Sequence, residues 1–81
     1  MVNRGAARYP WMQVRDRLAA RIGAGEFGTA GKLPSIRELA AQYQVAEVTV
    51  RKALRALRED GLIVTLPSWG SFAREDRPGG R

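Results

Sequence analysis

Residues 35–61 read SIRELAAQYQVAEVTVRKALRALREDG and contain two helical patterns separated by a short break. The first pattern opens with a capping box. The hydroxyl of Ser35 can accept a hydrogen bond from the backbone three residues on, and Glu38 can reach back to the backbone N–H of Ser35. We therefore expect a helix over about residues 36–43.

The second pattern is longer and more basic than the first. Residues 44–46 interrupt the first helix, and a second helix is predicted over about residues 47–60, with Gly61 in the position after the last turn that favours glycine. The apolar stripe of this helix consists of Val50, Ala53, Leu54 and Leu57. Two short helices joined by three residues, the second longer and basic, are typical of a helix-turn-helix.

The polar face of the second helix is predicted to carry charge of one sign. At about 100° per residue, Arg51, Lys52 and Arg55 fall on the side opposite the apolar stripe. Val48 falls among them, as an apolar side chain without a core to join. A generic solvated face would mix charges of both signs, so this arrangement indicates a surface that binds a polyanion.

The flanking segments predict a further helix and a small hairpin. Pro10 suits the first turn of a helix, since its missing N–H would have no partner there. An apolar stripe follows at helical spacing, formed by Trp11, Val14, Leu18 and Ile22. Residues 62–66 are β-prone, 67–70 form a turn and 71–73 return, which predicts a hairpin. The predicted fold is mainly α with a small β-hairpin wing: a three-helix winged helix-turn-helix.

The chain of 81 residues is long enough for one domain with a small core. Residues 1–8 and 74–81 carry charge and glycine without apolar periodicity. We therefore expect a flexible basic arm at the start and a flexible tail at the end. The winged helix-turn-helix should occupy residues 9–73.

The composition narrows the classes of function. The net charge is +6 and arginine supplies twelve of the fourteen basic residues, so the chain should attract nucleic acid or an anionic membrane surface. Cysteine and histidine are absent, which removes thiolate chemistry, the commonest general base and the commonest transition-metal ligand. The carboxylate pairs at 59–60 and 75–76 have no histidine beside them. The sequence therefore predicts no enzyme, no metal site and no cofactor.

The hydropathy pattern predicts where in the cell the protein is found. No apolar run approaches the roughly 20 residues of a membrane span, and the first residues lack the apolar stretch of a signal peptide. We expect a cytoplasmic, nucleoid-associated protein that does not bind membranes.

A set of short motifs runs through the predicted domain. They are GKLPS at 31–35, RELA at 37–40, TVRKAL at 49–54, GLI at 61–63 and GSF at 70–72, with Tyr43, Val45 and Leu57 between them. Together they resemble the DNA-binding domain of the GntR family of bacterial transcription regulators. The resemblance implies a winged helix that binds double-stranded DNA as a dimer on palindromic operators.

The resemblance also implies roles for particular residues. It places Arg37 on DNA, Thr49 and Arg51 at the front of a recognition helix in the major groove, and Gly70 in a minor-groove contact of the wing. We add to these the residues of the cationic face, the capped start of the first helix of the motif and the wing tip. The predicted DNA-binding residues are therefore Ser35, Arg37, Glu47, Val48, Thr49, Arg51, Lys52, Arg55, Trp69 and Gly70.

The chain departs from the family pattern in four respects. Ala46 replaces the usual Ser or Thr N-cap, a loss of about 1 kcal/mol. Glu47 stands where an arginine often reads guanine, and it either contacts a base or stabilises the positive end of the helix dipole. Ser68 and Trp69 replace a glycine and a basic residue at the wing tip. No effector-binding and dimerisation domain follows, so a small-molecule effector is not expected, and the chain is either a stand-alone domain or a piece of a longer protein.

The remaining aromatic and basic side chains have less specific expectations. Tyr9, Trp11 and Tyr43 are expected in the core, with the tyrosine hydroxyls at the surface. Trp69 can fold back onto the core, stack on a DNA sugar edge or contact a partner, and folding back is favoured. We expect three arginines of the first helix to face solvent or phosphate: Arg15, Arg17 and Arg21.

Three functions fit these observations. The favoured one is a sequence-specific transcription regulator, with the helix at about 47–60 in the major groove and the wing at about 62–73 on flanking backbone or minor groove. The alternatives are a winged-helix adaptor that binds protein, and a basic protein that binds nucleic acid, including RNA, without sequence choice. Sequence-selective affinity for DNA separates the first from the other two.

Overall fold

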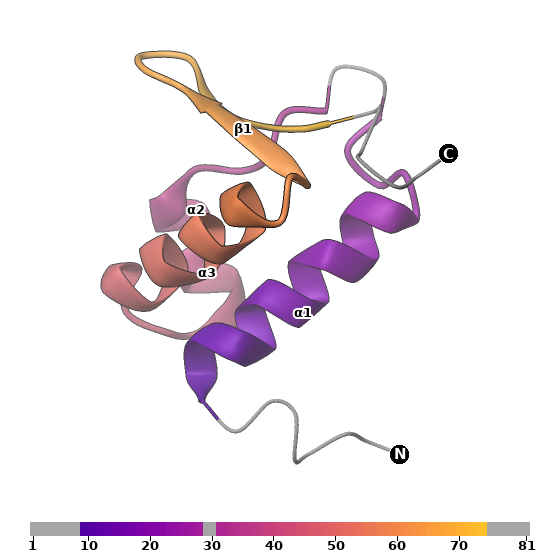
Figure 1. The fold of residues 1–81 in the computed structure, drawn as a ribbon. Helices are drawn as coiled ribbons and strands as arrows, with labels where there is room; N and C mark the ends of the chain where they lie inside the picture. Colours follow the sequence, from indigo (N-terminus) through magenta and orange to yellow (C-terminus); the bar gives the residue numbers. More distant parts are fainter. Residues whose placement is uncertain (1–8, 29–30, 75–81) are drawn as a thin grey trace.

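A computed structural model describes residues 9–28 and 31–74 of the chain. Three helices precede a two-stranded antiparallel hairpin, as predicted (Figure 1). The elements are α1 (Pro10–Gly23), α2 (Ile36–Tyr43), α3 (Glu47–Glu59), β1 (Ile63–Leu66) and β2 (Gly70–Ala73). The predicted arm at 1–8, and residues 75–81 of the predicted tail, lie outside the described residues.

The helix-turn-helix begins with the predicted capping box. The backbone N–H of Glu38 donates to the Ser35 hydroxyl at 3.0 Å, and the backbone N–H of Ser35 donates to the Glu38 carboxylate at 2.9 Å. Helix α3 has no side-chain cap at Ala46, but Glu47 places a negative charge in its first turn. Beyond its end, Gly61 adopts a φ of +77°, a conformation that glycine reaches without a steric cost.

Helix α3 lies at the centre of the fold and packs against α1, α2 and β1. Its predicted apolar stripe is buried in full. The core consists of Val14, Leu18, Ile22, Leu33, Leu39, Ala40, Val50, Ala53, Leu54, Leu57 and Ile63. Because this core takes one side of α3, the opposite side of the helix faces solvent.

The hairpin is tied to the helices by the segment that precedes α2. The backbone N–H of Leu33 donates to the Ser71 carbonyl at 2.9 Å, and that of Ala73 donates to the Gly31 carbonyl at 2.7 Å. Lys32 forms an antiparallel bridge with Phe72 between these bonds. The hairpin therefore has a third, short backbone partner in residues 31–33.

The close approach at Gly31 makes a testable prediction. Gly31 has a φ of +69°, and a Cβ added there would lie 2.9 Å from the Ala73 carbonyl oxygen. Gly28 has nearly the same φ, +70°, but open space around it. Both alanine variants should therefore lose about 1–2 kcal/mol for the left-handed backbone. Gly31→Ala should lose at least about 1 kcal/mol more in urea unfolding, because the hairpin must move. Equal losses would show that the hairpin has room to shift.

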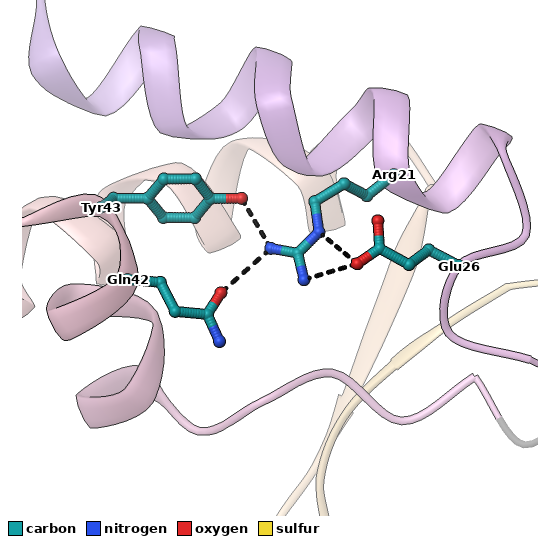
Figure 2. Close-up of polar contacts among 4 residues, drawn as sticks. All are labelled: Arg21, Glu26, Gln42 and Tyr43. Carbon is teal, nitrogen blue, oxygen red and sulfur yellow. Dashed lines mark hydrogen bonds and ion pairs between the residues drawn. The ribbon is translucent and has the colours of Figure 1, made fainter.

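Arg21 holds the ends of α1 and α2 together, which corrects the expectation that it faces solvent or phosphate (Figure 2). Its guanidinium donates to the Glu26 carboxylate at 3.0 Å, to the Gln42 side-chain oxygen at 3.2 Å and to the Tyr43 hydroxyl at 2.7 Å. The hydrogen bond to Glu26 is the main cause that raises the pKa of Arg21 above its ordinary value. Arg21 therefore belongs to the scaffold.

Three aromatic side chains lie further from the core than expected. Tyr9 is 56% exposed and Trp11 is half-buried, so the prediction that both join the core is wrong. Trp69 is 69% exposed, which overturns the expectation that it folds back. Tyr43 does pack against the core, with its hydroxyl bonded to Arg21. The small core is filled by aliphatic residues, which leaves the large rings at its edge.

Candidate nucleic-acid interface

The side of α3 that faces away from the core carries most of the predicted binding residues. Arg51, Lys52 and Arg55 are exposed, and Val48 is 66% exposed among them. Thr49 is half-buried at the front of the helix. The structure therefore brings the predicted residues of α3 onto one accessible surface, because the buried stripe fixes the rotation of the helix.

Arg51 and Glu47 form an ion pair one helical turn apart. The guanidinium and carboxylate lie 3.5 Å apart, and the two side chains are 59% and 48% exposed. A pair this exposed contributes about 0.3–0.5 kcal/mol, so its partners can exchange for other ligands. Glu47 thus stabilises the start of α3 and screens Arg51 without fixing it in place.

Arg58 continues the arginine row of α3 into the hairpin, and sequence reasoning missed it. Arg51, Arg55 and Arg58 are spaced four and three residues apart, so they share one side of the helix. The Arg58 guanidinium donates to the Thr65 hydroxyl of β1 at 3.2 Å, and that hydroxyl lies 3.0 Å from the Ser71 hydroxyl of β2. The spacing alone could have identified this residue, but its contact with the hairpin could not be seen from the sequence.

Lys52 lies on the α1 side of this surface. Its ammonium is 5.3 Å from the centroid of the Trp11 ring, and the Arg15 guanidinium is 5.2 Å from the same centroid. A hollow of about 510 Å³ opens beside this contact, lined by Tyr9, Pro10, Trp11, Met12, Val48, Thr49 and Lys52. The start of α1 thus extends the candidate surface beyond the helix-turn-helix.

A second hollow, of about 400 Å³, lies between the start of α2 and the hairpin. It brings together Ser35 and Gly70, two predicted site residues 35 positions apart in the chain. Lys32, Thr65 and Ser71 also line it. Arg37 is exposed in the first turn of α2 and lies outside this lining. The Glu38 carboxylate, which caps α2, lines the hollow as well. The hydroxyls and the Lys32 ammonium are the groups there that suit an anionic group such as a phosphate.

The wing tip has an unusual backbone and an exposed aromatic side chain. Trp69 stands between Ser68, with a φ of +70°, and Gly70, with a φ of +111°. Its backbone N–H donates to the Leu66 carbonyl at 2.9 Å, which closes the turn. The tip projects beyond the helices (Figure 1). The predicted wing residues Trp69 and Gly70 therefore lie at the tip of the hairpin that follows α3.

The candidate surface is made mainly of exposed cations and hydroxyls. Within the described ranges 9–28 and 31–74, no three Asp or Glu side chains gather where they could hold a metal ion. Among those same residues, no helix is both long and apolar enough to span a membrane. The exposed arginines, the hydroxyl-lined hollow and the projecting hairpin together form a surface with positive charge along much of its length.

Comparison with known proteins identifies the family to which this fold belongs. The family described as "Bacterial regulatory proteins, gntR family" matches residues 11–72, which is most of the chain. The chain belongs to the GntR family. The match covers all three helices and nearly the whole hairpin of this GntR-family domain.

Curated relatives of the GntR-family chain are bacterial regulators. It is 45% identical over 65 residues to the HTH-type transcriptional repressor NanR of Klebsiella aerogenes, and 38% identical over 68 residues to an uncharacterized HTH-type transcriptional regulator, RB1450, of Rhizobium meliloti. These matches cover 80% and 83% of this chain but only 24% and 28% of the relatives. The chain thus spans about a quarter of the length of the curated relatives it matches.

Solved structures show the same winged helix. The DNA-binding domain of AraR, in complex with operator ORE1, aligns with a TM-score of 0.77 at 29% identity, covering 82% of this chain and 80% of that one. A GntR family transcriptional regulator from Listeria monocytogenes aligns with a TM-score of 0.75 at 30% identity, covering 82% and 58%. The fold of the GntR-family chain is therefore that of domains solved on operator DNA.

Proposed function

We propose that this GntR-family chain binds a specific operator in double-stranded DNA and thereby regulates transcription at the nucleoid. The observation that carries the proposal is the exposed arginine row of α3, opposite the buried stripe, in a fold shared with an operator-bound domain. The proposed activity is binding alone, without catalysis, metal ion, cofactor or small-molecule effector in this segment.

The front of α3 would read bases in the major groove. Arg51 can donate two hydrogen bonds to guanine, and Val48 can pack against a thymine methyl group. Thr49 lies in the first turn of α3 on the side of Lys52, and it can bond to a base edge or a phosphate. Glu47 can accept from a cytosine amino group, although its exposed pair with Arg51 serves the start of the helix equally well.

Other residues would hold the DNA backbone. Arg55 and Lys52 would contact phosphates that flank the bases read by α3. Arg37 and the N-terminus of α2 at Ser35 would hold a further phosphate, because the first N–H groups of a helix favour an anion. The wing, with Trp69 and Gly70, would lie on the flanking backbone or minor groove.

Selection from random duplex DNA tests the proposal. The chain should enrich one sequence motif, and its affinity for that site should exceed its affinity for a scrambled duplex by about a thousandfold or more at physiological salt. Enrichment of no motif, with equal affinity for all duplexes, would favour a protein that binds nucleic acid without sequence choice. Absence of any DNA binding would favour the adaptor.

The affinity for the selected site should depend steeply on salt. If each protomer makes about 4–6 phosphate contacts, the slope of log affinity against log salt concentration should be about −4 to −5 per protomer. Fluorescence anisotropy with a labelled duplex, at salt concentrations from about 50 to about 200 mM, measures the slope. A slope near zero would contradict binding through these cations.

Two copies should pair on a palindromic site. The apolar stripes of all three helices are used by the core, so the isolated chain should be a monomer at low concentration. On a palindrome, the two α3 helices would enter major grooves about 10 base pairs apart. Affinity for the full palindrome should exceed that for a half-site, because the duplex holds both copies at high effective concentration. Analytical ultracentrifugation with and without DNA checks both points, and a stable dimer without DNA would contradict the first.

A further inference from the structure

The wing tip presents an aromatic side chain that the fold does not use. The Trp69 ring is 69% exposed, and within residues 9–28 and 31–74 its side chain has no hydrogen bond or cation–ring contact. Leu66, at the other side of the turn, is 47% exposed. A large apolar surface held at the end of a closed turn indicates a contact with another molecule.

The surroundings of the tip carry positive charge. A Cβ built on Gly70 would lie 3.4 Å from Cε and 3.8 Å from Nζ of Lys32, so the Lys32 ammonium reaches the turn itself. Within the described segments, neither Lys32 nor Arg58 has a carboxylate within ion-pair distance. Lys32 also lies over the Phe72 ring and Arg58 bonds to Thr65, so both cations stay on the hairpin. An apolar ring on a hairpin that carries these cations complements an anionic partner that also offers apolar surface. The sugars and base edges of a DNA groove between its phosphates have this chemistry.

The tip is also connected to the surface proposed to face DNA. The arginine row of α3 ends in the bond from Arg58 to Thr65, and the hydroxyl pair of Thr65 and Ser71 lies two residues from each end of the turn. Arg51 and Arg58 are about 10 Å apart along the helix axis. The four residues from Leu66 to Trp69, the first in β1 and the others in the turn, add about 13 Å at most. Both lengths together fall within one turn of the duplex, about 34 Å, in which a minor groove follows each major groove.

We propose that Trp69 enters the minor groove beside the half-site as an apolar wedge, so that the base step there is selected by how easily it unstacks. The inference rests on the proposed function and adds a way of reading sequence to it. Apolar side chains inserted from the minor groove partly unstack a base step and kink the duplex. Pyrimidine–purine steps such as TA and CA unstack most easily, whereas A-tracts are stiff. Trp69 therefore selects flexible flanking steps without hydrogen bonds to their bases.

The test compares duplexes that share the selected site and differ only in the flanking step. The wild-type chain should bind the duplex with TA flanks more tightly than that with A-tract flanks. Trp69→Ala should lower the affinity for the TA duplex by about 5- to 100-fold, as expected when a base loses an aromatic stacking partner. It should also abolish the difference between the two duplexes. Trp69→Phe should keep much of the preference.

The control is Val64→Ala, which removes apolar atoms from the same hairpin away from the tip and should change affinity by less than about twofold. A second readout compares tryptophan emission in the wild-type chain with that in Trp69→Phe, which keeps Trp11 as the one tryptophan. The wild-type emission should be quenched more strongly on binding the selected duplex. Melting followed by circular dichroism should show that the Trp69 and Val64 variants fold, because both residues are exposed.

Four outcomes separate this inference from the proposed function. Loss of the flank preference in Trp69→Ala, with the half-site still recognised, supports the wedge. If the wild-type chain is selective for its site and Trp69→Ala keeps both affinity and flank preference, the wedge is overturned and the proposed function stands. If Trp69→Ala behaves as wild type on DNA but loses self-association, the tip is a protein contact, which also overturns the wedge. If the wild-type chain prefers no site, the proposed function itself fails.

Discussion

Arg51→Ala should lose about 30-fold or more of its preference for the selected site over a scrambled duplex while keeping the stability of the wild-type chain. The Arg51 side chain is 59% exposed and its pair with Glu47 is a surface pair, so its removal should change the free energy of unfolding by no more than about 0.5 kcal/mol. The loss of one bidentate contact between arginine and guanine lowers the discrimination against other bases by about 1–3 kcal/mol. A palindrome contains two such contacts. Anisotropy competition with the selected and scrambled duplexes measures the effect.

The matched control for Arg51→Ala is Arg17→Ala. Arg17 is exposed on α1, outside the candidate surface, and its removal takes away the same charge. Both variants should weaken binding to scrambled duplex slightly, but Arg17→Ala should keep the specificity ratio. Thr49→Ala should also lower the specificity ratio with little loss of stability, since Thr49 lies in the first turn of α3 outside its buried stripe. If Arg51→Ala unfolds the domain, the assignment of the helix faces is wrong.

Leu54→Ala should have the opposite effect and destabilise the domain by about 2–5 kcal/mol. Leu54 is 4% exposed in a core of eleven residues, and the small domain has little aliphatic surface to compensate for the cavity. The midpoint of thermal unfolding should fall by about 10 °C or more, given roughly 4–8 °C per kcal/mol for domains of this size. Circular dichroism melting measures the shift.

Leu66→Ala is the control for the loss of leucine atoms. Leu66 is 47% exposed on β1, so its truncation should cost less than about 1 kcal/mol. At a low temperature where Leu54→Ala remains folded, this variant should still prefer the selected site, because Leu54 contacts no DNA in the proposed arrangement. Equal melting shifts in the two leucine variants would contradict the predicted core.

The helix-turn-helix was predictable from local chemistry. The capping box at Ser35 and Glu38, and glycine at position 61, set helix ends through contacts within a few residues. The apolar stripe of α3 then fixed which side is buried, and with it the exposure of Arg51 and Arg55. These features depend on periodicity and on neighbouring residues, which a sequence displays directly.

The errors concern contacts between distant segments. Trp11 lies on the apolar stripe of α1, yet only the position of α3 decides that its ring meets Lys52 instead of the core. Arg21 lies on the polar side of α1, yet the end of α2 supplies Gln42 and Tyr43 to hold it. In both cases the partner comes from a segment more than twenty residues away.

The sequence by itself determined the three helices, the hairpin, the face of α3 that meets the core and the sign of the charge opposite it. Each follows from a local rule of spacing, capping or turn formation. Only the tertiary structure decided that Arg58 bonds to Thr65, that Ser35 and Gly70 line one hollow, and that Trp69 points away from the core. The physical reason is that these relations depend on the angles at which packed elements meet, and those angles come from the packing of the whole core.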